Sequence, residues 1–67
     1  MKKYLIKTIF RDIYGKVYHS YVSKEYQSLA IAKRYLRPLQ EQIIIERTIW
    51  FDKNYRKHYK DVELPRE

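Results

Sequence analysis

The chain has 67 residues, of which 45% are hydrophobic and 34% are charged, and its 15 lysines and arginines against 8 acidic residues give a formal net charge of +7. This length allows one small domain, residues 1–67, and excludes a multidomain enzyme. The chain has no cysteine, which excludes disulfide scaffolds and thiolate zinc modules. A reducing intracellular setting is therefore expected, and the cytoplasm is the predicted location.

No stretch of the sequence is apolar over the about 20 residues that a membrane-spanning helix requires, so no membrane contact is expected. Lys2 and Lys3 open the chain in the manner of a signal peptide, but Lys7 and Arg11 interrupt the apolar segment that such a peptide needs. The start of the chain is therefore predicted to belong to the folded domain.

Residues 4–22 have the pattern of a β-hairpin. Residues 4–11 (YLIKTIFR) are rich in aromatic and β-branched side chains, and residues 16–22 (KVYHSYV) alternate between two faces. Between them, Asp12 can bond the backbone ahead of it, and Gly15, the only glycine, can adopt a positive φ at the exit of a turn.

A helix is predicted after this hairpin. Ser28 is the candidate N-cap, with Ser23 as the alternative, because a serine hydroxyl accepts hydrogen bonds from the free N–H groups of a first turn. Pro38 disfavours helical geometry at Arg37, so the helix is expected to stop or kink there. The apolar residues with helical spacing are Leu29, Ala32, Tyr35, Leu36 and Leu39.

The second half of the chain contains a further strand and an ambiguous segment. Residues 42–51 (QIIIERTIWF) predict a third strand with apolar groups on both sides, and residues 52–54 suit a second tight turn. Residues 53–67 then either supply a fourth strand, over residues 55–62, or form a flexible basic tail. The segments 8–12 and 48–52 are faintly alike, so a ββ-α-ββ arrangement is an alternative.

Together these elements predict an α+β fold: a small antiparallel sheet of three to four strands with one helix packed on one face, in the order β-β-α-β with or without a last strand. Neither face of this sheet is cleanly polar. The second face is therefore expected either to be covered or to remain a tyrosine-rich solvated surface. The candidate covers are the C-terminal segment, a second copy of the chain and a partner macromolecule.

The sequence offers little for catalysis or metal binding. Its two imidazoles, His19 and His58, adjoin no catalytic motif, and Asp12, Asp52 and Asp61 have the positions of turn or terminal residues. The chain has neither the His and Asp spacings that surround a metal ion nor a glycine-rich phosphate loop. A non-enzymatic protein without metal or cofactor is predicted.

The positive charge favours nucleic acid as the partner. Cationic side chains neutralise phosphates and release counterions, and a tyrosine ring offers a platform for an unpaired base. No residue pattern matches a known nucleic-acid-binding signature, so DNA or RNA, single or double strand, all remain open. The candidate phosphate ligands are Lys2, Lys3, Lys7, Arg11, Arg56, Lys57 and Lys60, and the candidate stacking residues are Tyr55 and Tyr59.

The alternative is a protein-binding module, acting either as a homodimer or as a small inhibitor of a larger host protein. Ile13, Tyr14 and Trp50 are its candidate anchors, because exposed aromatic and large apolar side chains dominate binding energy at interfaces. A compact, basic, cysteine-free chain of this size is typical of proteins that viruses and mobile elements encode.

Overall fold

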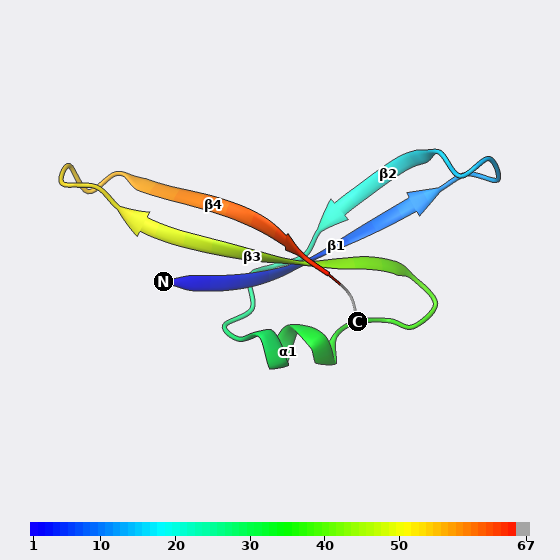
Figure 1. Ribbon diagram of the computed structural model, residues 1–67, viewed down its shortest axis with the longest axis horizontal. Coiled ribbons are helices and arrows are strands. Elements are labelled where there is room, and N and C mark those ends of the chain that lie inside the picture. Colours follow the sequence, from blue (N-terminus) through cyan, green and yellow to red (C-terminus); the bar gives the residue numbers. More distant parts are fainter. Residues whose placement is uncertain (66–67) are drawn as a thin grey trace.

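The computed structural model describes residues 1–65 and contains four strands and one helix: β1 (Lys2–Arg11), β2 (Val17–Val22), α1 (Leu29–Arg34), β3 (Glu41–Phe51) and β4 (Lys57–Leu64). All neighbouring strands are antiparallel, and their order in the sheet is β2-β1-β3-β4. The sheet therefore consists of two hairpins, β1–β2 and β3–β4, joined through β1 and β3. The hairpins point to opposite ends of an elongated molecule with extents of 48 × 24 × 18 Å (Figure 1).

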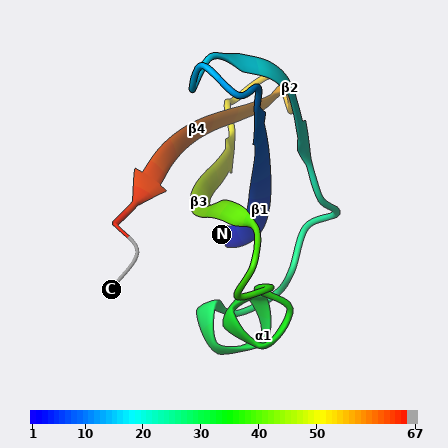
Figure 2. The same ribbon diagram turned by 90° about the vertical axis from the view of Figure 1, so that its right-hand side faces the viewer.

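The predicted α+β fold is wrong. The molecule is mostly strand: four strands of 10, 6, 11 and 8 residues form a curled antiparallel half-barrel, against one helix of 6 residues. β2 and β4 bend to opposite sides of the central strands, and α1 lies below them (Figure 2). The helix is too short to form a layer that covers a face of the sheet.

The early end of the helix explains this error. Ser28 caps α1 as predicted, since its hydroxyl accepts a hydrogen bond of 3.1 Å from the Ile31 N–H. The helix ends at Arg34, and Tyr35 is its C-cap with φ −96° and ψ 2°. Pro38 disfavours helical geometry at Arg37, where the sequence predicted the stop, but the helix already ends three residues before that position. Leu39, predicted to continue the apolar stripe, is 99% exposed.

The register assigns the central side chains to two faces, because directly opposed residues point to the same side of a sheet. Ile6 lies opposite Ile44 on the face towards α1, which we call the helix side, and Leu5 lies opposite Ile45 on the other, the open side. The buried hydrophobic side chains are Leu5, Ile6, Ala32, Ile44, Ile45 and Ile49. The core is thus small and divided between both faces.

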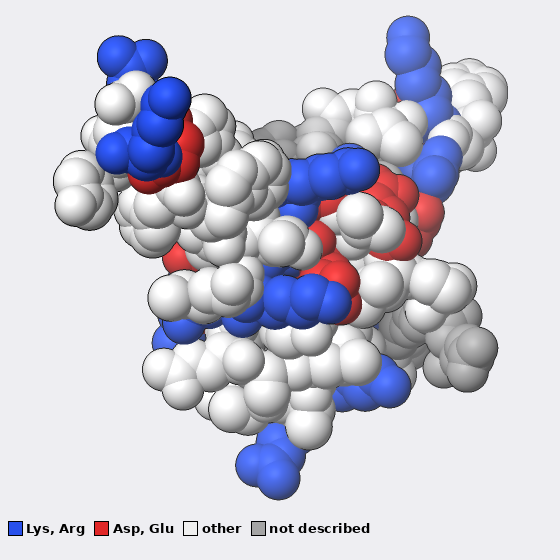
Figure 3. Space-filling model, turned by 60° about the vertical axis from the view of Figure 1, so that its left-hand side comes forward, with Lys and Arg blue, Asp and Glu red and all other residues white. Residues whose placement is uncertain are grey.

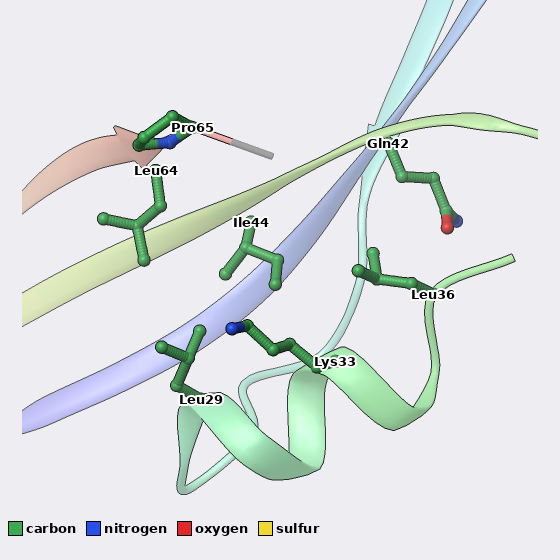
Figure 4. A pocket seen from close by; sticks show the side chains of 7 residues that line it. All are labelled: Leu29, Lys33, Leu36, Gln42, Ile44, Leu64 and Pro65. Carbon is green, nitrogen blue, oxygen red and sulfur yellow. The ribbon is translucent and has the colours of Figure 1, made fainter. Parts of the chain in front are cut away.

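A groove of about 360 Å³ remains between α1 and the sheet. Leu29 and Lys33 reach into it from the helix, and Ile44 and Leu64 line it from β3 and β4 (Figure 4). The groove is a direct consequence of the short helix, which leaves part of the helix side uncovered.

A buried polar pair fixes the connection between α1 and β3. Gln42, on the helix side, donates from Nε2 to the Thr8 hydroxyl at 3.1 Å and accepts at Oε1 from the Arg37 N–H at 2.7 Å. Thr8 is 1% exposed. Since buried polar groups are costly unless they are paired, this pair holds the connection against the sheet.

Candidate nucleic-acid interface

Both hairpins end in the same turn. In the β1–β2 hairpin, the Asp12 N–H donates to the Lys16 carbonyl (2.9 Å), and the Asp12 carbonyl accepts from the Gly15 N–H (3.0 Å). The Asp12 Oδ1 atom accepts from the N–H groups of Tyr14 (2.8 Å) and Lys16 (3.0 Å). Gly15 has φ +81°, the left-handed conformation that closes the turn.

Asp52 builds the same turn in the β3–β4 hairpin. The Asp52 N–H donates to the Arg56 carbonyl at 3.1 Å, and the Asp52 carbonyl accepts from the Tyr55 N–H at 3.0 Å. The Asp52 Oδ1 atom accepts from the N–H groups of Asn54 (2.8 Å) and Arg56 (3.0 Å). The left-handed residue here is Tyr55, with φ +62°. The faint likeness between segments 8–12 and 48–52 thus corresponds to two structurally equivalent hairpins.

The cations on the open side of the sheet are mostly paired with acids. Arg47 donates to both carboxylate oxygens of Asp61, at 2.8 and 3.0 Å. Its Nη1 atom also lies 3.5 Å from the Oε2 atom of Glu25. These hydrogen bonds are the main reason that the pKa of Asp61 lies below its ordinary value. Leu5 and Ile45 on this side are buried, and the aliphatic parts of long charged side chains are able to cover apolar groups in this way.

Three of the predicted phosphate ligands are engaged in the same way. The ion pairs are Lys2 with Glu46 at 3.2 Å, Lys7 with Glu63 at 3.7 Å and Arg11 with Glu41 at 2.7 Å. The hydrogen bond from Arg11 is the main cause that lowers the pKa of Glu41. Figure 3 shows the result: blue and red atoms lie next to one another across the middle of the molecule. Lys3, opposite Arg47 on the open side, has no ion pair within residues 1–65.

Near the tip of the β3–β4 hairpin, four cations have no acidic partner among the described residues, whereas Arg47, farther along β3, pairs with Asp61. This tip projects from the body of the molecule (Figure 1). In Figure 3 blue atoms reach outward at both hairpin tips. Tyr55, at the tip, is 89% exposed. The unpaired cations are Lys53, Arg56, Lys57 and Lys60.

Alternation along β4 divides these groups between two faces. Lys60 lies opposite Thr48 on the helix side, whereas Lys57 lies opposite Phe51 on the open side. Tyr59 is also on the open side, and the Arg47 guanidinium lies 4.4 Å from the centre of its ring. Of the two predicted stacking residues, Tyr55 is therefore unobstructed, and Tyr59 already has a cation on one face of its ring.

Sequence reasoning did not place Trp50 in this site. Trp50 is 47% exposed and lies opposite His58, with the two rings stacked at a centroid distance of 5.7 Å and an interplanar angle of 19°. Asp52 Oδ2 lies 2.9 Å from His58 Nε2, and this contact is the largest cause that lowers the pKa of Asp52. A register for the predicted turn at residues 52–54 would have placed residue 50 opposite residue 58, and this is the signal in the sequence that could have identified the pair.

The residues of the protein-binding alternative are not brought together. Ile13 and Tyr14 lie at the tip of the β1–β2 hairpin, 92% and 87% exposed, whereas Trp50 belongs to the opposite hairpin. The described part of the chain holds no group of three His, Cys, Asp or Glu side chains suited to a metal ion, and His19 and His58 lie on different hairpins.

No helix within residues 1–65 is long and apolar enough to cross a membrane. No protein-family model, curated protein or solved structure matches this chain.

Proposed function

We propose that this protein is a non-enzymatic nucleic-acid-binding protein and that its β3–β4 hairpin is the contact surface. One observation carries the proposal: four cations that have no acidic partner within residues 1–65 lie on a projecting hairpin beside the exposed rings of Tyr55 and Trp50. Paired cations elsewhere on the sheet are poor phosphate ligands, because binding a phosphate would require each to give up its carboxylate. An unpaired cation that neutralises a phosphate releases counterions condensed on the nucleic acid and breaks no ion pair of the protein.

The arrangement of the hairpin favours a duplex over a single strand. Trp50, His58 and Lys60 lie on one face of the two-stranded ribbon, and Lys57 and Tyr59 lie on the other. A single strand that stacks on a platform uses one face, whereas the major groove of B-DNA admits a two-stranded ribbon and surrounds it with phosphates. Cations on both faces fit the second geometry.

The absence of catalysis is part of the proposal. Nucleophilic or acid–base catalysis needs a convergent set of groups. On the hairpin, the closest such set is Asp52 with His58, and Asp52 Oδ1 is already used to hold the turn. We assign this pair to the turn and to the orientation of the His58 ring beside Trp50. A cytoplasmic location, expected from the lack of cysteine, completes the proposal.

The direct test is a fluorescence-anisotropy titration of the protein with labelled duplex DNA, single-stranded DNA and RNA at two salt concentrations. We expect duplex DNA to bind most tightly and more weakly at the higher salt. Log K falls with log salt, and the double variant Lys57→Gln/Lys60→Gln should make this negative slope shallower by about 1.8, at about 0.9 for each phosphate contact that is lost. Lys7→Gln/Lys24→Gln removes the same charge elsewhere and should leave the slope unchanged. Equal losses in both double variants, or no binding at low salt, would contradict the proposal.

A second candidate function rests on the exposed tip of the other hairpin. Ile13 and Tyr14 are the most exposed large side chains of the β1–β2 turn, and such residues anchor protein interfaces. If the protein acts by binding a host protein there, Tyr14→Ala abolishes the complex without unfolding the chain. Lys57→Gln/Lys60→Gln then has no effect on that complex.

A further inference from the structure

The two edges of the sheet differ in charge. β2 and β4 are the outer strands, and each has one side that no other strand covers within residues 1–65. Edge strands commonly carry charged side chains that oppose pairing with other chains. β4 (KHYKDVEL) has four charged residues, whereas β2 (VYHSYV) has none and all six of its residues are exposed. Only β4 is protected in this way.

Equivalent positions in the two hairpins make the contrast sharper. Tyr21 and Lys60 both lie opposite a threonine, Thr8 in one hairpin and Thr48 in the other. Three uncharged residues of β2 have charged counterparts at the matched positions of β4: Lys57 matches Val17, Lys60 matches Tyr21, and Asp61 matches Val22. The same backbone position is therefore charged on one edge and uncharged on the other.

We propose that β2 pairs in an antiparallel manner with β2 of a second copy of this chain, about a two-fold axis at Ser20. Such an interface must be self-complementary, because each copy presents the same strand. With the axis at Ser20, His19 lies opposite Tyr21 of the second copy, and Tyr18 lies opposite Val22. Aromatic pairs and aromatic with β-branched pairs are the favourable cross-strand combinations. The two half-barrels then form one continuous sheet.

The hydrogen bonds of β2 are compatible with this register. The Ser23 N–H donates to the Ile6 carbonyl at 2.8 Å, so the polar groups of Ser23 point to β1. Because this direction alternates along an antiparallel strand, the polar groups of Val22 and Ser20 point outward. An axis at Ser20 joins the two Ser20 backbones by a pair of hydrogen bonds. The irregularity in β1–β2 pairing lies between Phe10 and Arg11, towards the turn, so Ser20 is in the regular part of the strand.

An aromatic row on the helix side supports the same interface. The Phe10 ring lies 5.7 Å from the His19 ring and 5.9 Å from the Tyr21 ring, and both pairs are stacked. In the dimer, His19 and Tyr21 of the second copy continue this row across the axis. The β3–β4 hairpins lie at the far ends of the dimer, but the interface itself does not depend on nucleic-acid binding.

The test is sedimentation equilibrium of the full chain over a concentration series up to about 1 mM, the range in which weak dimers form. We expect a dimer for the wild type. Ser20→Lys and Ser20→Glu each set two like charges against one another at the axis and should weaken the dimer about a hundredfold. An equimolar mixture of the two variants should restore it, because Lys then lies opposite Glu. Val62→Lys adds the same charge to the β4 edge and should leave dimerisation unchanged.

Far-UV circular dichroism checks that each variant is folded. Tyr21→Lys, which gives β2 the residue that β4 has at the matched position, is the second variant if Ser20→Lys does not fold. A wild type that is monomeric throughout the series would overturn the proposal. So would a Ser20→Lys variant that dimerises as well as the wild type, or a mixture that stays monomeric.

Discussion

The β1–β2 and β3–β4 hairpins share one backbone geometry and present different chemistry on it. In both turns an aspartate carboxylate holds two N–H groups and a left-handed residue closes the loop. The positions between them carry Ile13 and Tyr14 in one hairpin and Lys53 and Asn54 in the other. The fold uses the aspartate and the backbone, so the remaining turn positions are available for binding.

The two hairpins differ most clearly in the residue that adopts the left-handed backbone conformation, which is Gly15 in one turn and Tyr55 in the other. Gly15 adopts this conformation without steric cost, whereas a tyrosine in it costs about 1–2 kcal/mol. Backbone strain of this kind concentrates at functional sites. Tyr55 is therefore the residue of this turn whose substitution tests the proposed contact surface most sharply.

The largest expected effect comes from the residues that join the hairpins. Leu5 and Ile45 are buried, lie opposite one another and occupy equivalent positions in β1 and β3. Leu5→Ala should cost about 2–5 kcal/mol in free energy of unfolding, and both hairpins should lose their structure together. Urea unfolding followed by NMR signals from each hairpin measures this, with Leu39→Ala as the exposed control. Survival of one hairpin alone would contradict the account.

The aspartates test whether the two turns are equivalent. Asp12→Ala and Asp52→Ala should each lower the free energy of unfolding by about 1–2 kcal/mol, because each leaves two backbone N–H groups without their acceptor. Asp52→Ala should cost more, since Asp52 also contacts His58. Thermal unfolding of the two variants gives the comparison. The assignment fails if Asp12→Ala is neutral while Asp52→Ala is costly.

Exchanging the left-handed residues tests the strain in the second turn. Gly15→Ala should cost about 1 kcal/mol, although nothing lies within 4 Å of the added Cβ atom, because only the backbone conformation opposes it. Tyr55→Gly should raise the thermal midpoint slightly and weaken nucleic-acid binding at the same time. A Tyr55→Gly variant with wild-type affinity would remove Tyr55 from the proposed site.

Acid should weaken the β3–β4 side of the molecule more than the other. The pKa values of Asp52 and Asp61, in this hairpin, lie below the ordinary 3.8 because of His58 and Arg47, and that of Glu41 lies below 4.5 because of Arg11. A lowered pKa in the folded state gives stability that is present above the unfolded-state pKa and is lost as pH falls through the folded value.

The thermal midpoint should therefore be constant from neutral pH to about pH 5 and fall below about pH 4. Asp61→Asn should have a lower midpoint at neutral pH and a shallower fall in acid. An equally steep fall in both proteins would show that the Arg47–Asp61 pair does not contribute.

Local signals in the sequence predicted the first three strands and left the fourth open against a flexible tail. Features that depend on non-local packing could not be predicted. The alternation in residues 4–11 and 16–22 and the turn at Asp12 correspond to β1, β2 and their turn. The helix was overestimated because Tyr35, Leu36 and Leu39 keep helical spacing beyond Arg34, where the helix ends. Spacing alone does not show that a helix this short leaves a sheet face uncovered.

The candidate site shows the same limit. Charge and aromatic content identified the residues of the β3–β4 hairpin, but the partners of Lys2, Lys7 and Arg11 come from distant strands and are invisible to composition. Trp50 and His58 are neighbours only because of the register between β3 and β4. Sequence therefore indicated a basic surface, and the structure showed which of its cations have acidic partners.

The most direct test compares Lys16→Gln with Arg56→Gln. These two residues occupy the same position in the two turns, each donating its N–H to the turn aspartate at 3.0 Å, and each substitution removes one positive charge. The measurement is an anisotropy titration with duplex DNA at several salt concentrations. Arg56→Gln should weaken binding and make the negative slope of log K against log salt shallower by about 0.9, whereas Lys16→Gln should do neither. Equal effects of the two substitutions would show that the net charge of the chain, rather than the β3–β4 hairpin, determines binding.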